Sequence, residues 1–86
     1  MRILGGGERI RVREGMAGGP PKDFIWRGRR HEVRAVEVCG DGFGLGRSEP
    51  KRIVRLRTAT GMRCQLSLDP RDGSWRIEHV LPAAGG

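Results

Sequence analysis

Residues 52–81 read RIVRLRTATGMRCQLSLDPRDGSWRIEHVL. Apolar and polar residues alternate in three parts of this stretch, and we interpret these parts as strands over residues 52–59, 62–68 and 75–81. The interruptions between them contain Thr, Asp, Pro, Ser and Gly, which are typical of tight turns. The stretch therefore predicts two consecutive hairpins.

The register of the first hairpin follows from the rule that opposed residues in an antiparallel pair share a face, so apolar residues must meet apolar residues. A two-residue loop would place Leu56 opposite Gln65. A loop formed by residues 59–61 places Leu56 opposite Cys64 instead, and it suits a turn in which Gly61 is left-handed. This register, continued through the next turn, gives the inward pairs Thr58 with Met62, Val54 with Leu66, Leu68 with Trp75, Leu66 with Ile77 and Cys64 with His79.

The earlier part of the chain alternates in the same way and predicts strands over residues 8–14, 22–27 and 30–38. Val36 and Val38 fall on the opposite face from Phe24 and His31, which indicates a β-bulge near Ala35 and Val36. The remaining segments are interpreted as a flexible connector over 15–21, a mobile glycine-rich loop over 40–51 and a disordered tail over 83–86.

A chain of 86 residues is enough for one small domain, which we place over residues 1–82. Five to six short strands in a flat sheet would leave both edges and one face uncovered. We therefore expect an all-β fold, in which a strongly bent antiparallel sheet forms a small SH3-like or OB-like barrel.

The chain is basic, with 17 Lys and Arg against 10 Asp and Glu and a formal charge of +7. Because GC-rich codons favour Arg and Gly alike, this excess alone is only a modest argument for a polyanionic partner. No apolar run exceeds three residues, so neither a membrane span nor the apolar core of a secretory signal is expected. We expect a cytoplasmic protein with reduced cysteines and no membrane partner.

The predicted register also fixes the outer face of the last three strands. Arg57 falls opposite Arg63, although like charges directly opposed in a sheet are unfavourable. The other outward pairs are Arg55 with Gln65, Ser67 with Arg76 and Gln65 with Glu78. Such a face suits a polyanion, because arginine makes bidentate contacts with phosphate. A simply solvated face, with arginine stems covering apolar neighbours and Glu78 as partial compensation, is the alternative.

A second basic cluster occupies the turn over residues 26–31, which reads WRGRRH. Trp26 could stack on a base, but it alternates with Phe24 and is expected in the core. Together the two clusters give the candidate nucleic-acid-binding residues Arg27, Arg29, Arg30, Arg55, Arg57, Arg63 and Arg76.

The sequence lacks the usual motifs of catalytic and metal-binding sites. We find no HExxH motif, no plausible Ser, His and acid set and no paired carboxylates in an apolar setting, so we expect a non-enzyme. Four side chains would be enough to bind zinc, namely those of His31, Cys39, Cys64 and His79, but their spacing in the sequence is unlike that of a zinc finger. We expect neither a metal nor a cofactor. Residues 40–47 are rich in glycine but lack the GxGxxG register and a following helix.

Residues 24–33 read FIWRGRRHEV, and VRLR at 54–57 and SWRI at 74–77 follow them. This pattern, F-x-W-R-G-R-x-H-x-V with a closing W-x-hydrophobic strand, resembles a small bacterial domain family of unknown function. Similar segments form the C-terminal tail of the inactive Y-family polymerase homologue of the bacterial mutasome. The resemblance spans about residues 20 to 82. It implies a small β-barrel and a link to DNA damage tolerance, and it supplies no catalytic or binding residue.

The chain departs from that family at one place. Members of the family carry a W-W-R segment before the fourth strand, where this chain has GFGLGR at residues 42–47. A ligand or partner contact made by those tryptophans would therefore be absent here.

We accordingly expect a non-catalytic accessory module that binds single-stranded or irregular nucleic acid. The alternative is an adaptor that docks an acidic or proline-containing protein, with the basic face steering association. A further possibility is a homodimer formed by pairing of exposed strand edges.

Overall fold

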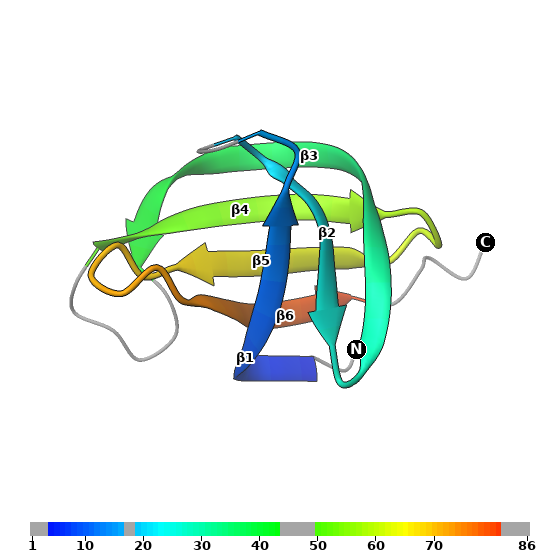
Figure 1. Ribbon diagram of the computed structural model, residues 1–86, viewed down its shortest axis with the longest axis horizontal. Coiled ribbons are helices and arrows are strands. Elements are labelled where there is room, and N and C mark those ends of the chain that lie inside the picture. Colours follow the sequence, from blue (N-terminus) through cyan, green and yellow to red (C-terminus); the bar gives the residue numbers. More distant parts are fainter. Residues whose placement is uncertain (1–3, 17–18, 44–49, 82–86) are drawn as a thin grey trace.

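The computed structural model describes residues 4–16, 19–43 and 50–81, and these residues form six strands and no helix. The strands are β1 (Leu4–Glu14), β2 (Pro21–Trp26), β3 (Arg29–Phe43), β4 (Pro50–Thr58), β5 (Arg63–Leu68) and β6 (Trp75–Leu81). Each pairs antiparallel with the next, and β6 pairs with β1, so the sheet closes on itself (Figure 1). The predicted all-β fold with a small closed barrel is confirmed.

Two long strands bend the sheet into a barrel. The first part of β1 pairs with β6 and its second part with β2, while β3 passes from β2 to β4. As a result β1 and β2 cross the direction of β4, β5 and β6 (Figure 1). The register of β3 against β4 shifts on both sides of Ala35 and Val36, where a bulge was predicted.

The core lies between these two crossing layers. Phe24 from β2 and Leu56, Leu66 and Ile77 from the last three strands are completely buried. Burying a large apolar side chain contributes roughly 1.5–3 kcal/mol. The other buried apolar residues are Ile10, Trp26, Val54, Cys64, Trp75 and Val80. Trp26 therefore belongs to the core, as predicted.

The register predicted for the β4–β5 hairpin is confirmed. Leu56 lies opposite Cys64 and Val54 opposite Leu66, and the backbone N–H of Thr58 donates to the carbonyl of Met62 at 2.8 Å. Gly61 closes the turn with φ of +91°, a conformation that costs other residues about 1 kcal/mol or more. In the next hairpin, Leu68 opposite Trp75 and Leu66 opposite Ile77 are likewise confirmed.

The end of β6 differs from the prediction. The β5–β6 register shifts between Gln65 and Leu66, so Cys64 lies opposite Val80 and Gln65 opposite His79. The predicted pairs of Cys64 with His79 and of Gln65 with Glu78 are wrong, because Glu78 is the additional residue of a bulge. The bulge keeps both Ile77 and Val80 inside, with exposures of 0% and 1%, which strict alternation would forbid.

Most of the segment boundaries differ from the prediction by one residue or more, and the differences are largest at the glycine-rich loop and at the start of β1. β3 continues through Phe43 and β4 begins at Pro50, so the predicted loop over 40–51 is wrong at both ends. Glycine suits position 42 of this strand, because the Cβ of any other residue would lie only 3.0 Å from Ile53 Cγ1. Similarly, β1 begins at Leu4 rather than at residue 8, and Pro21 of the predicted connector belongs to β2. Residues 17–18, 44–49 and 83–86, on which parts of these predictions fall, lie outside the described residues.

A buried ion pair holds the β5–β6 turn against the start of β4. Lys51 Nζ, whose side chain is only 3% exposed, lies 3.4 Å from Asp69 Oδ2. Arg71 also binds this carboxylate, through its side chain and through its backbone N–H. These bonds from Arg71, aided by the nearby charge of Lys51, hold the pKa of Asp69 well below its usual range.

The two-residue β2–β3 turn provides a test of backbone strain. Arg27 and Gly28 both have positive φ, +52° and +76°, as a type I′ turn requires. Gly28→Ala should lower the free energy of unfolding by about 1 kcal/mol, because a Cβ at Gly28 meets nothing within 4 Å and only the backbone conformation is penalised. Gly40→Ala is the control, since Gly40 has equally open surroundings and no positive φ. Equal urea midpoints for the two variants would contradict this account.

The Asp69 cluster predicts a pH dependence. Since folding lowers the pKa of Asp69 below its ordinary 3.8, the stabilisation is complete above that value and is lost as the pH falls through the folded pKa. Asp69→Asn should therefore melt lower than the parent near neutral pH, and the difference should shrink toward about pH 2. Asp41→Asn, on an exposed strand residue, should show no such trend. A constant gap in melting temperature between the Asp69 variant and the parent would contradict the ion-pair origin.

Candidate functional site

The outer face of β4, β5 and β6 displays a row of arginines. Because Leu56 and Leu66 point inward, their strand neighbours point outward. Arg57 lies opposite Arg63 and Arg76 lies opposite Ser67, while Arg55 lies opposite Gln65. At about 3.3 Å per residue, the row extends roughly 13 Å along β5. The structure thus brings Arg55, Arg57, Arg63 and Arg76 onto one face, as the sequence predicted.

These four arginines have few anionic partners within the described residues. Arg55 Nε donates to Gln65 Oε1 at 2.9 Å, and Arg76 Nη1 donates to the Gly7 carbonyl at 2.9 Å. Arg63 has a carboxylate partner, with its Nη2 at 3.6 Å from Glu37 Oε2. Arg57 is exposed and has no ion pair in the described part of the chain. The face therefore keeps most of its positive charge.

The buried carboxylate of Glu78 partly offsets this charge, as the alternative interpretation of the face anticipated. Glu78 is 2% exposed, and Ser67 Oγ donates to its Oε1 at 2.6 Å. The bulge in β6 places this carboxylate near the Arg76 end of the row. At the Arg57 end, farther along the same strands, Glu37 forms an ion pair with Arg63.

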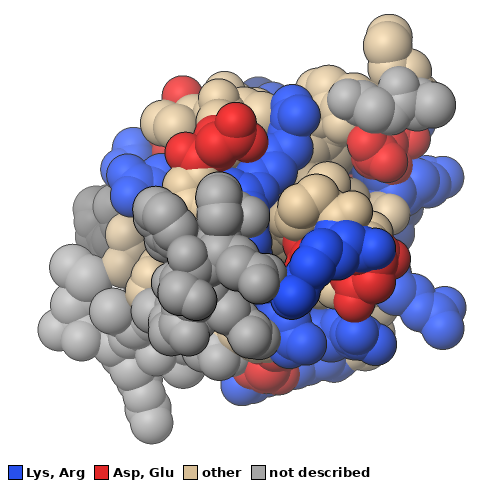
Figure 2. All heavy atoms as spheres, turned by 90° about the vertical axis from the view of Figure 1, so that its left-hand side faces the viewer, with Lys and Arg blue, Asp and Glu red and all other residues tan. Residues whose placement is uncertain are grey.

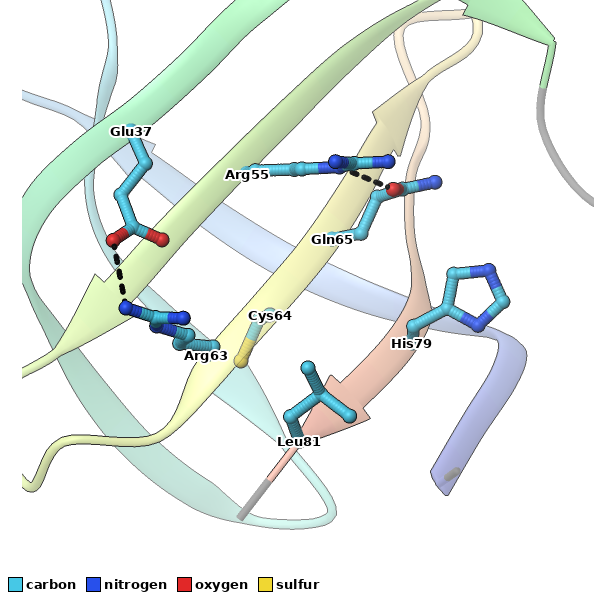
Figure 3. A pocket seen from close by; sticks show the side chains of 7 residues that line it. All are labelled: Glu37, Arg55, Arg63, Cys64, Gln65, His79 and Leu81. Atoms are coloured by element: carbon cyan, nitrogen blue, oxygen red, sulfur yellow. Dashed lines mark hydrogen bonds and ion pairs between the residues drawn. The ribbon is translucent and has the colours of Figure 1, made fainter. Parts of the chain in front are cut away.

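A hollow of about 400 Å³ opens on this face. In Figure 3 the Arg55–Gln65 pair forms one side of it, the Glu37–Arg63 pair a second and His79 a third, with Cys64 and Leu81 between Arg63 and His79. It thus combines charged and amide groups at its sides with apolar surface between them.

Two lining residues escaped the sequence prediction because both depend on bulges. His79 was expected to face inward opposite Cys64, whereas the bulge at Glu78 turns it outward beside Gln65. Glu37 is the additional residue of a second bulge, between Val36 and Val38 of β3. The three-residue spacing of the apolar pair Ile77 and Val80 is the signal that could have indicated the first bulge.

Burial affects two of the groups that line the hollow, the thiol of Cys64 and the imidazole of His79. Burial raises the pKa of the Cys64 thiol to about 12, so this thiol is neutral and behaves as apolar lining. His79 Nδ1 is buried and has no hydrogen-bond partner within the described residues. A ligand that offers both a flat apolar face and polar edges would complement this mixture.

The arginines of the β2–β3 turn are separate from this site, and none of them lines the hollow. Arg27 binds Glu8 through two hydrogen bonds of 3.1 and 2.6 Å, which hold the pKa of Glu8 below its usual value. Arg30 lies 3.1 Å from Asp23, which also binds Arg13. The remaining turn arginine, Arg29, is exposed. Carboxylates thus largely compensate the second predicted cluster.

The end of the barrel that carries the β5–β6 turn shows a similar mixture. Figure 2 views this end, and acidic groups lie among the basic ones over its described surface. Asp69 binds Lys51 and Arg71, and Arg9 lies 3.9 Å from Asp72. This end therefore offers no continuous basic surface among the described residues.

The possible zinc ligands do not gather. Across the described residues, no three His, Cys, Asp or Glu side chains lie close enough together to hold a metal ion. His31 instead stacks on Phe24 at a centroid distance of 5.1 Å, and burial followed by the charge of Arg29 lowers its pKa. None of the described segments is a helix long and apolar enough to cross a membrane.

In comparisons with family models, curated proteins and solved structures, none matches this chain. The resemblance to the mutasome-associated tail therefore stays a prediction. The function is argued below from the geometry of the arginine face.

The two cysteines provide a direct check on the hollow. Cys39 is exposed, whereas Cys64 is buried with its thiol protonated. In the folded protein at about pH 8, a thiol reagent such as iodoacetamide should therefore modify Cys39 alone, because the thiolate is the reactive form. Mass spectrometry should show one adduct for the parent and none for Cys39→Ser. Rapid modification of Cys64 without denaturant would contradict its assignment as neutral lining.

Proposed function

We propose that this barrel is a non-catalytic module that binds single-stranded nucleic acid across the outer face of β4, β5 and β6. One observation carries the proposal, namely the cross-strand row of arginines on one face with a single carboxylate ion partner among the described residues. Opposed arginines repel each other, and a bound phosphate relieves that repulsion while it releases counterions. Through the sequence resemblance, the proposal extends to a role in DNA damage tolerance in a bacterial cytoplasm.

A single strand fits this face better than a duplex does. The hollow beside Arg55 and Arg63 has apolar surface from Cys64 and Leu81, which suits the ring of an unpaired base. In a duplex the base faces are stacked and hidden, so no base would be free to enter the hollow. Arg57, Arg63 and Arg76 lie on the same outer face as the hollow, so the phosphates of one strand would contact them while a base enters the hollow.

An acidic protein partner is the second candidate function. Val36 and Val38 on β3 are 37% and 51% exposed, and Val38 adjoins Arg55 and Gln65 in a neighbouring depression. Exposed valines beside a basic face would suit a peptide that carries both acidic and apolar side chains. Each described strand has a neighbour on both sides, so a homodimer through strand edges is not among our proposals.

The salt dependence of binding tests the proposed face. Fluorescence anisotropy with a labelled single-stranded DNA, its duplex and the matching RNA should show tighter binding of single strands, with affinity falling as salt rises. Arg57→Ala with Arg63→Ala should reduce the slope of log affinity against log salt by about 1.4, at about 0.7 for each lost phosphate contact on a single strand.

Arg11→Ala with Lys22→Ala is the matched control. It removes the same two charges from exposed residues of β1 and β2 that do not line the hollow, so it should leave the slope nearly unchanged. An unchanged slope in the Arg57 and Arg63 variant, or an equal change in both variants, would rule out this face. Preferential binding of an acidic peptide with no binding of any nucleic acid would favour the second candidate.

A further inference from the structure

The lining of the hollow is unsuited to a bare phosphate group. The side chain of Glu37 is 35% exposed beside Arg63, and its negative charge would repel a phosphate that entered there. The neutral thiol of Cys64 is only a weak donor, and the side chain of Leu81 offers a phosphate no hydrogen bond. The phosphate contacts proposed above therefore belong to the exposed arginines around the hollow, and the hollow itself is left for another part of the strand.

The hollow matches a nucleobase in size and chemistry. Its volume of about 400 Å³ lies within the range of pockets that hold small ligands. An aromatic base has apolar faces that suit Leu81 and Cys64, and the imidazole of His79 offers a ring on which a base can stack. The edges of a base carry donors and acceptors that suit the Glu37–Arg63 and Arg55–Gln65 pairs.

We propose that the hollow holds one unpaired guanine of the bound strand, an inference that rests on the proposed function. The Watson–Crick edge of guanine presents two adjacent N–H donors, at N1 and N2, followed by the acceptor O6. Glu37 provides two acceptor oxygens, and the guanidinium of Arg63, 3.6 Å away, provides the donor beside them. Figure 3 shows this carboxylate and guanidinium side by side at the left of the hollow.

The other bases match this arrangement less well. Adenine presents one donor beside one acceptor, thymine presents one donor between two acceptors, and cytosine has a single donor group beside two acceptors. Each of them leaves one Glu37 oxygen without a donor or places an acceptor against it. A carboxylate oxygen that a bound base covers without donating a hydrogen bond to it is costly, so the carboxylate selects the base that satisfies both of its oxygens.

The next nucleotide also has a place to bind. A second depression of about 360 Å³ shares Arg55 and Gln65 with the hollow, and its other lining residues are Val38, Gly40, Asp41, Gly42 and Ile53. The hydrogen-bonded Arg55–Gln65 pair thus separates two neighbouring compartments. A base in the second compartment would meet aliphatic surface from Val38 and Ile53 and the carboxylate of Asp41.

Base preference tests the inference. The probes are labelled eight-nucleotide thymidine strands with one central dG, dA or dC, measured by anisotropy at one salt concentration. The parent protein should bind the dG strand about fivefold tighter or more than the dA strand, as a good bidentate contact provides. Glu37→Gln, which removes one acceptor oxygen, should reduce this preference below about twofold. It should not weaken binding of the dA and dC strands, because it removes a negative charge from the basic face.

Glu14→Gln is the matched control. Glu14 is an exposed residue of β1 that does not line the hollow, so this variant gains the same charge and should keep the full dG preference. Melting curves of both variants confirm that they are folded before binding is compared.

The outcomes separate the two proposals. Equal binding of all three strands by the parent, or an undiminished dG preference in Glu37→Gln, would overturn the guanine assignment. If that binding still depended on Arg57 and Arg63, the proposed function would stand without it. If no strand bound at all, both proposals would fall together.

Discussion

The contacts among Leu56, Leu66 and Ile77 inside the barrel determine what the outer face can display. These three residues come from adjacent strands and are completely buried. Because side chains alternate along a strand, their burial forces Arg55, Arg57 and the outward residues of β5 to the outside. The arginine row is thus a direct consequence of core packing, and a shift of one residue in register would bury the arginines and expose the core.

The bulge in β6 affects both the packing of the core and the residues displayed on the outer face. The core needs Val80 opposite Cys64, where Val80 is buried, although Val80 lies three residues after Ile77. Insertion of Glu78 into the bulge satisfies that need, and it also turns His79 outward to complete one side of the hollow. The bulge in β3 brings Glu37 to the opposite side by the same geometry. Glu37 and His79, two of the polar residues that line the hollow, are therefore placed by bulges and not by regular pairing.

This explains how far the sequence could predict the molecule. Alternation and the turn at Gly61 were sufficient for the barrel, the β4–β5 register and the shared face of Arg55, Arg57, Arg63 and Arg76. Alternation could not predict the facing of His79, because a bulge is chosen by the fit of the whole core rather than by local pattern. Likewise, Gly40 and Gly42 were interpreted as loop residues since glycine is rare in strands. Only the pairing with β4, where Gly42 fits against Ile53, reveals their role. The ion pair between Arg27 and Glu8 could not be predicted either, because the two residues lie far apart in the sequence.

The arginine face keeps its positive charge because most of the paired carboxylates bind basic residues elsewhere. The carboxylates of Glu8, Asp23, Asp69 and Asp72 bind basic residues of the turns and of the N-terminal strands. Of these, the Arg27–Glu8 and Arg9–Asp72 pairs are exposed, and exposed ion pairs neutralise charge locally more than they stabilise a fold. Among the described residues they leave Arg55 and Arg57 without a carboxylate partner, and the opposed arginines at Arg57 and Arg63 cost up to about 1 kcal/mol. A polyanion bound as proposed would gain its own contacts and also remove that repulsion, so the pairing that slightly weakens the free barrel would strengthen the proposed complex.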